Sequence, residues 1–130
     1  ALLDQLRSSA WSLQPLPDIG ARHPELAAAY AAAEAEWSAG RMDVAVELLA
    51  QFAYHSDPDV VLDMTWKHAQ MRYRMGEILG ALEVITRGLL SAGGDPLLRS
   101  RLFALQGQLL ERRGQPEEAI RAYRMAVEVR

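Results

Sequence analysis

The side chains that most often bind metals or carry out catalysis are few in this sequence of 130 residues, which contains three histidines and no cysteine. His23, His55 and His68 stand far apart and follow no spacing that is typical of metal ligands. Glu117 and Glu118 are typical of a helix start, where acidic side chains face the positive end of the helix dipole. The sequence has no glycine-rich phosphate loop, nucleophile elbow or zinc-protease motif. We therefore expect no catalytic residue, no metal site, no cofactor and no enzymatic activity.

Arginines gather in the last third of the chain, where a basic patch would favour anions or nucleic acid. Acidic residues are interspersed among them, which favours ordinary surface pairs, and the net charge of the chain is −3. We expect no nucleic-acid partner. We also expect no membrane insertion and a cytoplasmic location, because no apolar run approaches the roughly 20 residues of a membrane helix. The arginines that could form such a patch are Arg99, Arg101, Arg112, Arg113, Arg121 and Arg124.

The composition predicts helices. The sequence has 21 Ala and 19 Leu, which are strong helix formers, and a strand-rich protein would carry more β-branched residues. It also has 13 Arg and one Lys, a bias typical of a GC-rich genome, which favours a bacterial source. All-α is therefore the expected fold class.

Proline and glycine divide the chain at regular places. Prolines 24, 58, 96 and 116 suit the first position of a helix, where the missing N–H would have no helical partner. Glycines 40, 76 and 114 are typical helix ends, because glycine adopts the left-handed conformation without strain. Residues 2–13 form an expected first helix, and 14–22 an irregular connector. The six helices that we expect to follow span 24–39, 41–55, 58–75, 77–91, 96–113 and 116–130.

The chain repeats itself. The three loop glycines are 36 and 38 residues apart, and an alanine stands five residues after each of them. A small residue stands seven residues before each glycine, and a branched apolar residue follows each alanine. Helix pairs with matching small residues pack closely and stack on their neighbours. The repeated alanines are Ala45, Ala81 and Ala119, and the preceding small residues are Ala33, Ala69 and Gly107.

At these positions the chain resembles the tetratricopeptide repeat family, most strongly in the last repeat. The signature positions there are held by Phe103, Gly107, Leu110, Gly114, Ala119, Tyr123 and Ala126. The first two repeats depart from the pattern at four positions, which hold Glu36, Phe52, Arg72 and Gly88. The resemblance covers 23–130 and implies a right-handed superhelical stack of three helix-turn-helix pairs, 24–57, 58–95 and 96–130. Residues 1–22 would form a preceding helix and a proline-rich connector.

The resemblance also implies a binding groove, because the first helix of each pair lines the concave face in that family. The side chains expected there are Tyr30, Trp37, Trp66, Gln70, Tyr73, Arg74, Arg101, Gln108 and Arg112. Tyrosine and tryptophan combine a large contact area with one polar atom, and Arg pairs with carboxylates. The alternative is that these aromatics belong to the core, as a seven-residue spacing often indicates. The family's clamp for C-terminal carboxylates is missing, because Tyr30 and Glu34 stand where it needs Lys and Asn.

The last helix carries apolar residues on the side away from its small-residue stripe. Ile120, Val127 and Val129 would be exposed there, because no helix follows them in the sequence. We expect either that the chain is part of a longer protein or that another chain covers this end. Residues 1–63 hold three Arg against ten acidic residues, whereas 99–130 hold seven against four. This charge gradient favours head-to-tail self-association, or else is a chance asymmetry of a solvated surface.

The expected function is therefore protein binding: a preformed groove would take a partner helix or peptide, anchored by aromatics and oriented by arginine. The first hypothesis is a regulatory or scaffold part of a larger bacterial protein. The alternatives are a stand-alone adaptor or secretion-type chaperone, and a self-associating homo-oligomer joined through the C-terminal end. The identity of the partner is not encoded in any motif.

Overall fold

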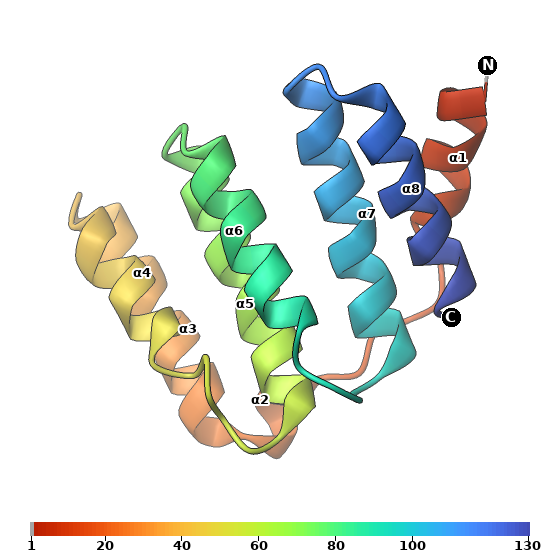
Figure 1. Cartoon of the computed structure of the whole chain (residues 1–130). Helices are drawn as coiled ribbons and strands as arrows, with labels where there is room; N and C mark the ends of the chain where they lie inside the picture. The colour runs from red at the N-terminus through yellow and green to blue at the C-terminus, as the bar shows by residue number, and fades with distance from the viewer. Residues whose placement is uncertain (1) are drawn as a thin grey trace. The chain divides into compact units, whose positions relative to one another are not determined.

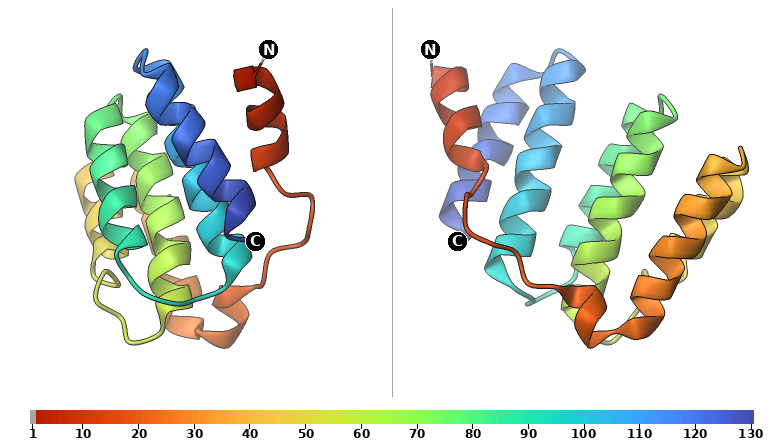
Figure 2. Two further views of the ribbon diagram at one scale, coloured as in Figure 1. Left: turned by 45° about the vertical axis from the view of Figure 1, so that its right-hand side comes forward. Right: turned by 180° about the vertical axis from the view of Figure 1, so that it is seen from behind.

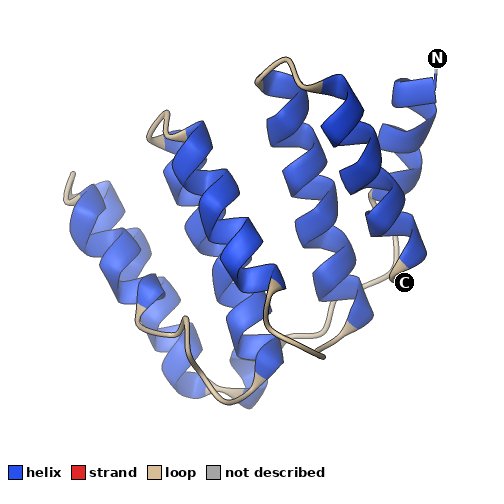
Figure 3. Ribbon diagram, in the orientation of Figure 1, coloured by secondary structure: helices blue, strands red, loops and turns tan. Residues whose placement is uncertain are grey.

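The computed structural model describes residues 2–130, and within them it contains helices joined by loops and no strand (Figures 1 and 3). The predicted all-α class is therefore confirmed. None of these helices is long and apolar enough to cross a membrane. The eight helices are α1 (Leu2–Ala10), α2 (Ile19–Arg22), α3 (Pro24–Ser38), α4 (Met42–Ala50), α5 (Pro58–Arg74), α6 (Ile78–Leu89), α7 (Pro96–Arg112) and α8 (Pro116–Glu128).

Three predictions about the helices are wrong. The helix predicted over 41–55 is α4, which ends at Ala50. Helix α1 ends at Ala10 rather than near residue 13, and Leu13 lies fully exposed in the connector. The segment predicted as an irregular connector contains one helical turn, α2. Its start is capped because the Asp18 carboxylate accepts a hydrogen bond from the Ala21 N–H at 3.1 Å, and Ile19 is buried.

Aspartate and proline fix the start of two long helices. The carboxylate of Asp57 accepts a hydrogen bond from the N–H of Asp59 at 2.9 Å, and α5 begins at the intervening proline. Asp95 does the same for Leu97 at the start of α7, at 2.8 Å. These bonds satisfy N–H groups that have no partner inside the helix.

Glycine fixes the tight turns between paired helices. Gly40, Gly76 and Gly114 have φ angles of +82°, +81° and +75°, in the left-handed region that favours glycine. Each turn reverses the chain, so that α3 packs against α4, α5 against α6 and α7 against α8. The turns therefore create three helix hairpins, in the places that the sequence predicted.

The chain divides into two compact units. Residues Pro17–Ala92 form one unit, which contains α2 to α6 and in which α4 also packs against α5. Small side chains allow close packing inside it: Ala33, Ala45, Ala69 and Ala81 are completely buried. Gly88 lies very close to α5. A Cβ atom on Gly88 would be 2.4 Å from the hydroxyl oxygen of Thr65.

The second unit joins the beginning of the chain to its end. It contains residues up to Leu16 together with Gly93–Arg130, and α1 packs against both α8 and α7 (Figure 2). Gly107 of α7 faces the ring of Tyr123 of α8, and a Cβ atom on Gly107 would lie 2.5 Å from the Cε1 atom of that ring. The Arg130 guanidinium donates hydrogen bonds to the carbonyl oxygens of Ser9 and, at 2.7 Å, of Ala10. The N-terminal helix therefore packs against the last helix of the chain.

Candidate functional site

Helices α3 and α5 carry four of the predicted aromatic side chains, and two of these make contacts from one helix to the other. The Tyr30 hydroxyl of α3 donates a hydrogen bond to Asp63 Oδ2 of α5, at 2.6 Å. The Lys67 ammonium of α5 lies 5.6 Å from the centre of the Tyr30 ring, within the range of a cation–π interaction. Tyr30 is thus held between two charged groups of the neighbouring helix.

Trp37, the residue before the last one of α3, makes the second connection. The guanidinium carbon of Arg74 lies 4.4 Å from the centre of a Trp37 ring, so that an exposed arginine stacks on a half-buried tryptophan. Arg74 was predicted to pair with a partner's carboxylates. In the structure the flat face of the Arg74 guanidinium stacks on the Trp37 ring, and this stacking fixes the direction in which the guanidinium N–H groups point.

The four aromatic side chains of this surface, Tyr30, Trp37, Trp66 and Tyr73, are all half-buried. They are more covered than isolated surface side chains and less covered than the core. Gln70 of α5 is also half-buried. This combination of fixed position and partial exposure is typical of side chains that line a binding surface.

The remaining predicted groove residues lie on α7, in the other unit. Arg101 and Gln108 are half-buried and Arg112 is exposed. A cavity of about 480 Å³ lies beside the last turns of α7 and is lined by Arg7, Trp11, Gln108, Glu111, Arg112 and Tyr123. The predicted groove set is therefore divided, with six residues in Pro17–Ala92 and three in the unit that contains α7.

An ion pair that the sequence did not predict lies at this second cavity. Arg7 of α1 donates to both carboxylate oxygens of Glu111, from Nε at 2.8 Å and from Nη2 at 2.6 Å, and the Tyr123 hydroxyl donates to the same carboxylate. The Arg7 guanidinium is the main cause of a lowered pKa of Glu111. The pair joins residues 104 positions apart, and neither side chain has a sequence pattern that would have indicated it.

The predicted C-terminal interface is only partly exposed. Ile120 and Val129 are half-buried, and 38% of Val127 is accessible to solvent. The expectation that all three would be exposed is therefore wrong for Ile120 and Val129. This end of the unit is packed against α1, which the order of helices in the sequence did not suggest.

A larger cavity, of about 630 Å³, opens beside α4, α5 and α6 within Pro17–Ala92. Its volume falls within the usual range for small-molecule pockets. Burial lowers the pKa of the His68 imidazole to about 4, and the nearby charges of Arg72 and Arg87 lower it further. Arg72 Nε donates to His68 Nε2 at 3.1 Å, which matches a neutral ring. The cavity is lined by Ala50, Ala53, Tyr54, His55, Val61, Met64, Thr65, His68, Val84, Arg87, Gly88, Leu90 and Ser91.

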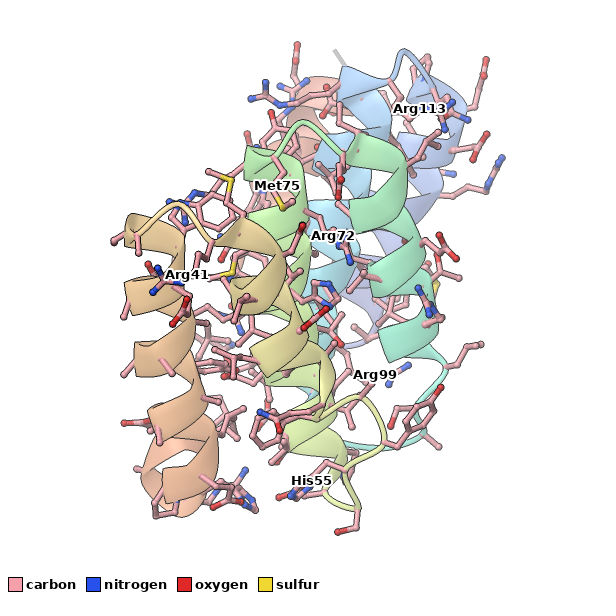
Figure 4. All side chains as sticks on the ribbon, turned by 90° about the vertical axis from the view of Figure 1, so that its left-hand side faces the viewer. Arg41, His55, Arg72, Met75, Arg99 and Arg113 are labelled. Atoms are coloured by element: carbon pink, nitrogen blue, oxygen red, sulfur yellow. The ribbon has the colours of Figure 1, made fainter. Side chains whose placement is uncertain are left out.

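The fold also brings together two of the histidines that the sequence separates. The rings of His23 and His55 have centroids 5.3 Å apart, and the carboxylate of Glu25 lies beside both. His55 lies in the loop between α4 and α5 (Figure 4). His23 immediately precedes α3. The prediction from spacing alone missed this cluster, because its members lie 32 residues apart and meet only when α5 packs beside α3. His68 is the third histidine and lies on the wall of the larger cavity.

No protein-family model, no curated protein and no solved structure matches the chain.

Proposed function

We propose that this chain is a tetratricopeptide-like helical repeat module that binds a helix or an extended peptide of a partner protein. Three helix hairpins with glycine turns at matching places support the repeat character. Small residues stand seven positions before and five positions after each of those glycines, and they support the repeat further. Five of these six residues are completely buried alanines, and the sixth, Gly107, is also buried.

The observation that carries the binding role is the ordered aromatic surface of α3 and α5. Tyr30 is fixed by its hydrogen bond to Asp63, and Trp37 by the stacked guanidinium of Arg74. Tyr, Trp and Arg are the residue types that most often dominate the energy of protein interfaces. Because these side chains are already ordered, a partner would lose less conformational entropy in binding them than in ordering flexible side chains.

We propose further that the module is a regulatory or scaffold part of a larger bacterial protein. A stand-alone adaptor or secretion-type chaperone would use the same surface. Self-association through the end of α8 is not part of the proposal, because α1 packs against that helix within the chain.

The experiment that tests the proposal is affinity capture followed by calorimetry. The whole chain and its Trp37→Ala variant are used to capture proteins from an extract of the producing cells, and a captured protein is purified for titration. We expect Trp37→Ala to weaken binding about 10- to 100-fold, because loss of a central interface aromatic costs roughly 1.4–3 kcal/mol.

Two further variants separate a lost surface from a damaged fold. Arg74→Ala changes an exposed side chain on the same surface, and we expect it to weaken binding with an unchanged circular dichroism spectrum. Leu79→Ala removes an exposed apolar side chain from α6 and is the matched control, with 63% of Leu79 accessible. If Trp37→Ala and Arg74→Ala bound the captured partner as tightly as Leu79→Ala and the natural chain do, this binding surface would be refuted.

A further inference from the structure

Two imidazoles and a carboxylate converge where α3 begins beside the loop that precedes α5. His23 Nδ1 lies 3.2 Å from Glu25 Oε1, and His55 Nε2 lies 3.8 Å from the same oxygen. One donor atom from each of the three residues lies within 4.8 Å of the other two. All three side chains belong to the unit Pro17–Ala92.

We propose that His23 Nδ1, Glu25 and His55 Nε2 bind one divalent transition-metal ion of the Zn²⁺ class. Tetrahedral zinc with bonds of about 2.0–2.2 Å requires donor atoms roughly 3.3 Å apart. The separation of 3.2 Å between His23 Nδ1 and Glu25 Oε1 matches this value, and the 3.8 Å between His55 Nε2 and the same oxygen is longer. Imidazole nitrogen suits zinc, nickel and copper, whereas magnesium and calcium prefer sites made of oxygen alone. Three protein ligands leave a fourth position for water or for a group of a partner.

Asp57 supports this site as a positioning residue. Its Oδ2 atom lies 2.7 Å from His23 Nε2 and accepts a hydrogen bond from that nitrogen, while Nδ1 faces Glu25. A metal ion would replace the proton of Nδ1, and Asp57 would keep the proton of the bound ring on Nε2. The other carboxylate oxygen, Oδ1, accepts the Asp59 N–H at the start of α5 and fixes the Asp57 side chain. A carboxylate behind a metal-binding histidine is the usual means of orienting the ring.

Metal binding requires one local rearrangement. The Asp57 N–H donates to His55 Nδ1 at 3.0 Å, which puts the proton of a neutral His55 on Nε2. When a metal ion binds His55 Nε2, that nitrogen loses its proton and Nδ1 becomes protonated. A protonated Nδ1 cannot accept the Asp57 N–H, so this hydrogen bond breaks. His55 lies in the loop 51–57, and a shift of up to about 1.5 Å brings the three donors to zinc spacing.

The consequence of such a site is a metal link between the start of α3 and the loop before α5. A ligand that binds the folded state alone raises the unfolding temperature, by about 5–10 °C for a chain of this size at 100 times its dissociation constant. This role goes beyond the proposed protein-binding function and does not depend on it.

Zinc titration of the whole chain tests the proposal. The untagged, chelator-treated protein is titrated with ZnCl₂ in a calorimeter, and ¹⁵N spectra of the imidazole rings are recorded. We expect one Zn²⁺ per chain, with coordination shifts at Nδ1 of His23 and Nε2 of His55 and none at His68. Titration with MgCl₂ is expected to give no binding heat.

Matched variants assign the ligands. We expect His55→Ala to weaken zinc binding more than about 100-fold, because it removes a ligand. Asp57→Asn should weaken binding about 10- to 100-fold, because it removes the carboxylate that orients His23. The fold should stay intact in Asp57→Asn, because asparagine still caps α5. Glu25→Gln should weaken binding at least about 10-fold, whereas Glu34→Gln, an exposed change on the same helix, should leave it unchanged. The absence of zinc binding, unchanged binding by Glu25→Gln, or coordination shifts at His68 alone would overturn the proposal.

Discussion

The close approach of α7 and α8 at Gly107 predicts that Gly107→Ala destabilises the protein, although alanine favours helices. A Cβ atom at this position would lie 2.5 Å from Tyr123 Cε1 and 2.6 Å from Cδ1, whereas real Cβ contacts essentially never fall below 3.0 Å. The Tyr123 ring is completely buried and its hydroxyl is bound to Glu111, so a movement of the ring towards the neighbouring cavity would strain or break that hydrogen bond. The two helices must therefore separate, or the ring must leave its hydrogen bond.

The expected magnitude follows from two opposing effects. Replacing glycine by alanine inside a helix stabilises it by about 1 kcal/mol. Overpacking a dense core costs about 1–3 kcal/mol, and loss of the hydrogen bond from Tyr123 to the Glu111 carboxylate costs about 1.5–3 kcal/mol more if the ring moves. We expect a net loss of about 1–3 kcal/mol in the free energy of unfolding. For a chain of this size that corresponds to a fall in Tm of roughly 4–12 °C.

Urea unfolding followed by circular dichroism at 222 nm measures this loss. Gly80→Ala is the matched control, because a Cβ atom at position 80 would find its nearest neighbour, Glu77 Cβ, at an ordinary 3.5 Å. We expect that variant to be as stable as the natural chain or slightly more stable, since only the helix-propensity effect applies. Equal or greater stability of Gly107→Ala would refute the reasoning, because it would mean that the ring of Tyr123 does not fill this space.

Two further measurements test the buried polar groups. Ser100→Ala should lower the free energy of unfolding by about 1–3 kcal/mol, because the Ser100 hydroxyl donates to the Ala126 carbonyl at 2.6 Å and is buried; an unchanged urea midpoint would contradict this. His68 has a pKa near 4 in the folded chain, below its ordinary value, so the unfolded state binds more protons between pH 4 and pH 6.5. The resulting stabilisation, about 2–3 kcal/mol, should be complete above pH 6.5 and lost as the pH falls towards 4. Urea midpoints at pH 4.5 and 7.0 should differ less in His68→Gln than in the natural chain, and an equal difference would argue against a neutral buried His68.

The helices were predictable because their signals are local. Asp57 and Asp95 precede prolines, and each carboxylate satisfies an N–H group within two residues of itself. Gly40 and Gly76 turn the chain where a side chain would be strained. These interactions involve neighbours in the sequence, so residue type and spacing are sufficient to indicate them.

The sites were less predictable because they depend on contacts between distant parts of the chain. Arg7 meets Glu111 across 104 positions, and His23 meets His55 across two helices. Neither pair repeats at a helical period, so no periodic pattern indicates that its members meet. The half-buried state of Trp37 also depends on the neighbouring helix, because Arg74 covers its ring. The sequence therefore allowed the aromatic residues to be named but left open the choice between groove and core.

The position of α1 changes the interpretation of the apolar side chains on α8. The prediction of an interface at this end assumed that the covering element, if any, must follow α8 in the sequence. The first helix takes that place instead, with Arg7 paired to Glu111 and Ala10 buried, while its outer side exposes Asp4 and Ser8. A polar outer face on the terminal element is what keeps a helical repeat array from associating at its ends. Met125 and Val127 of α8 still have more than a third of their surface exposed, so α1 covers this helix only in part. The proposal of partner binding rests instead on the aromatic surface of α3 and α5, whose side chains are held by contacts between the two helices.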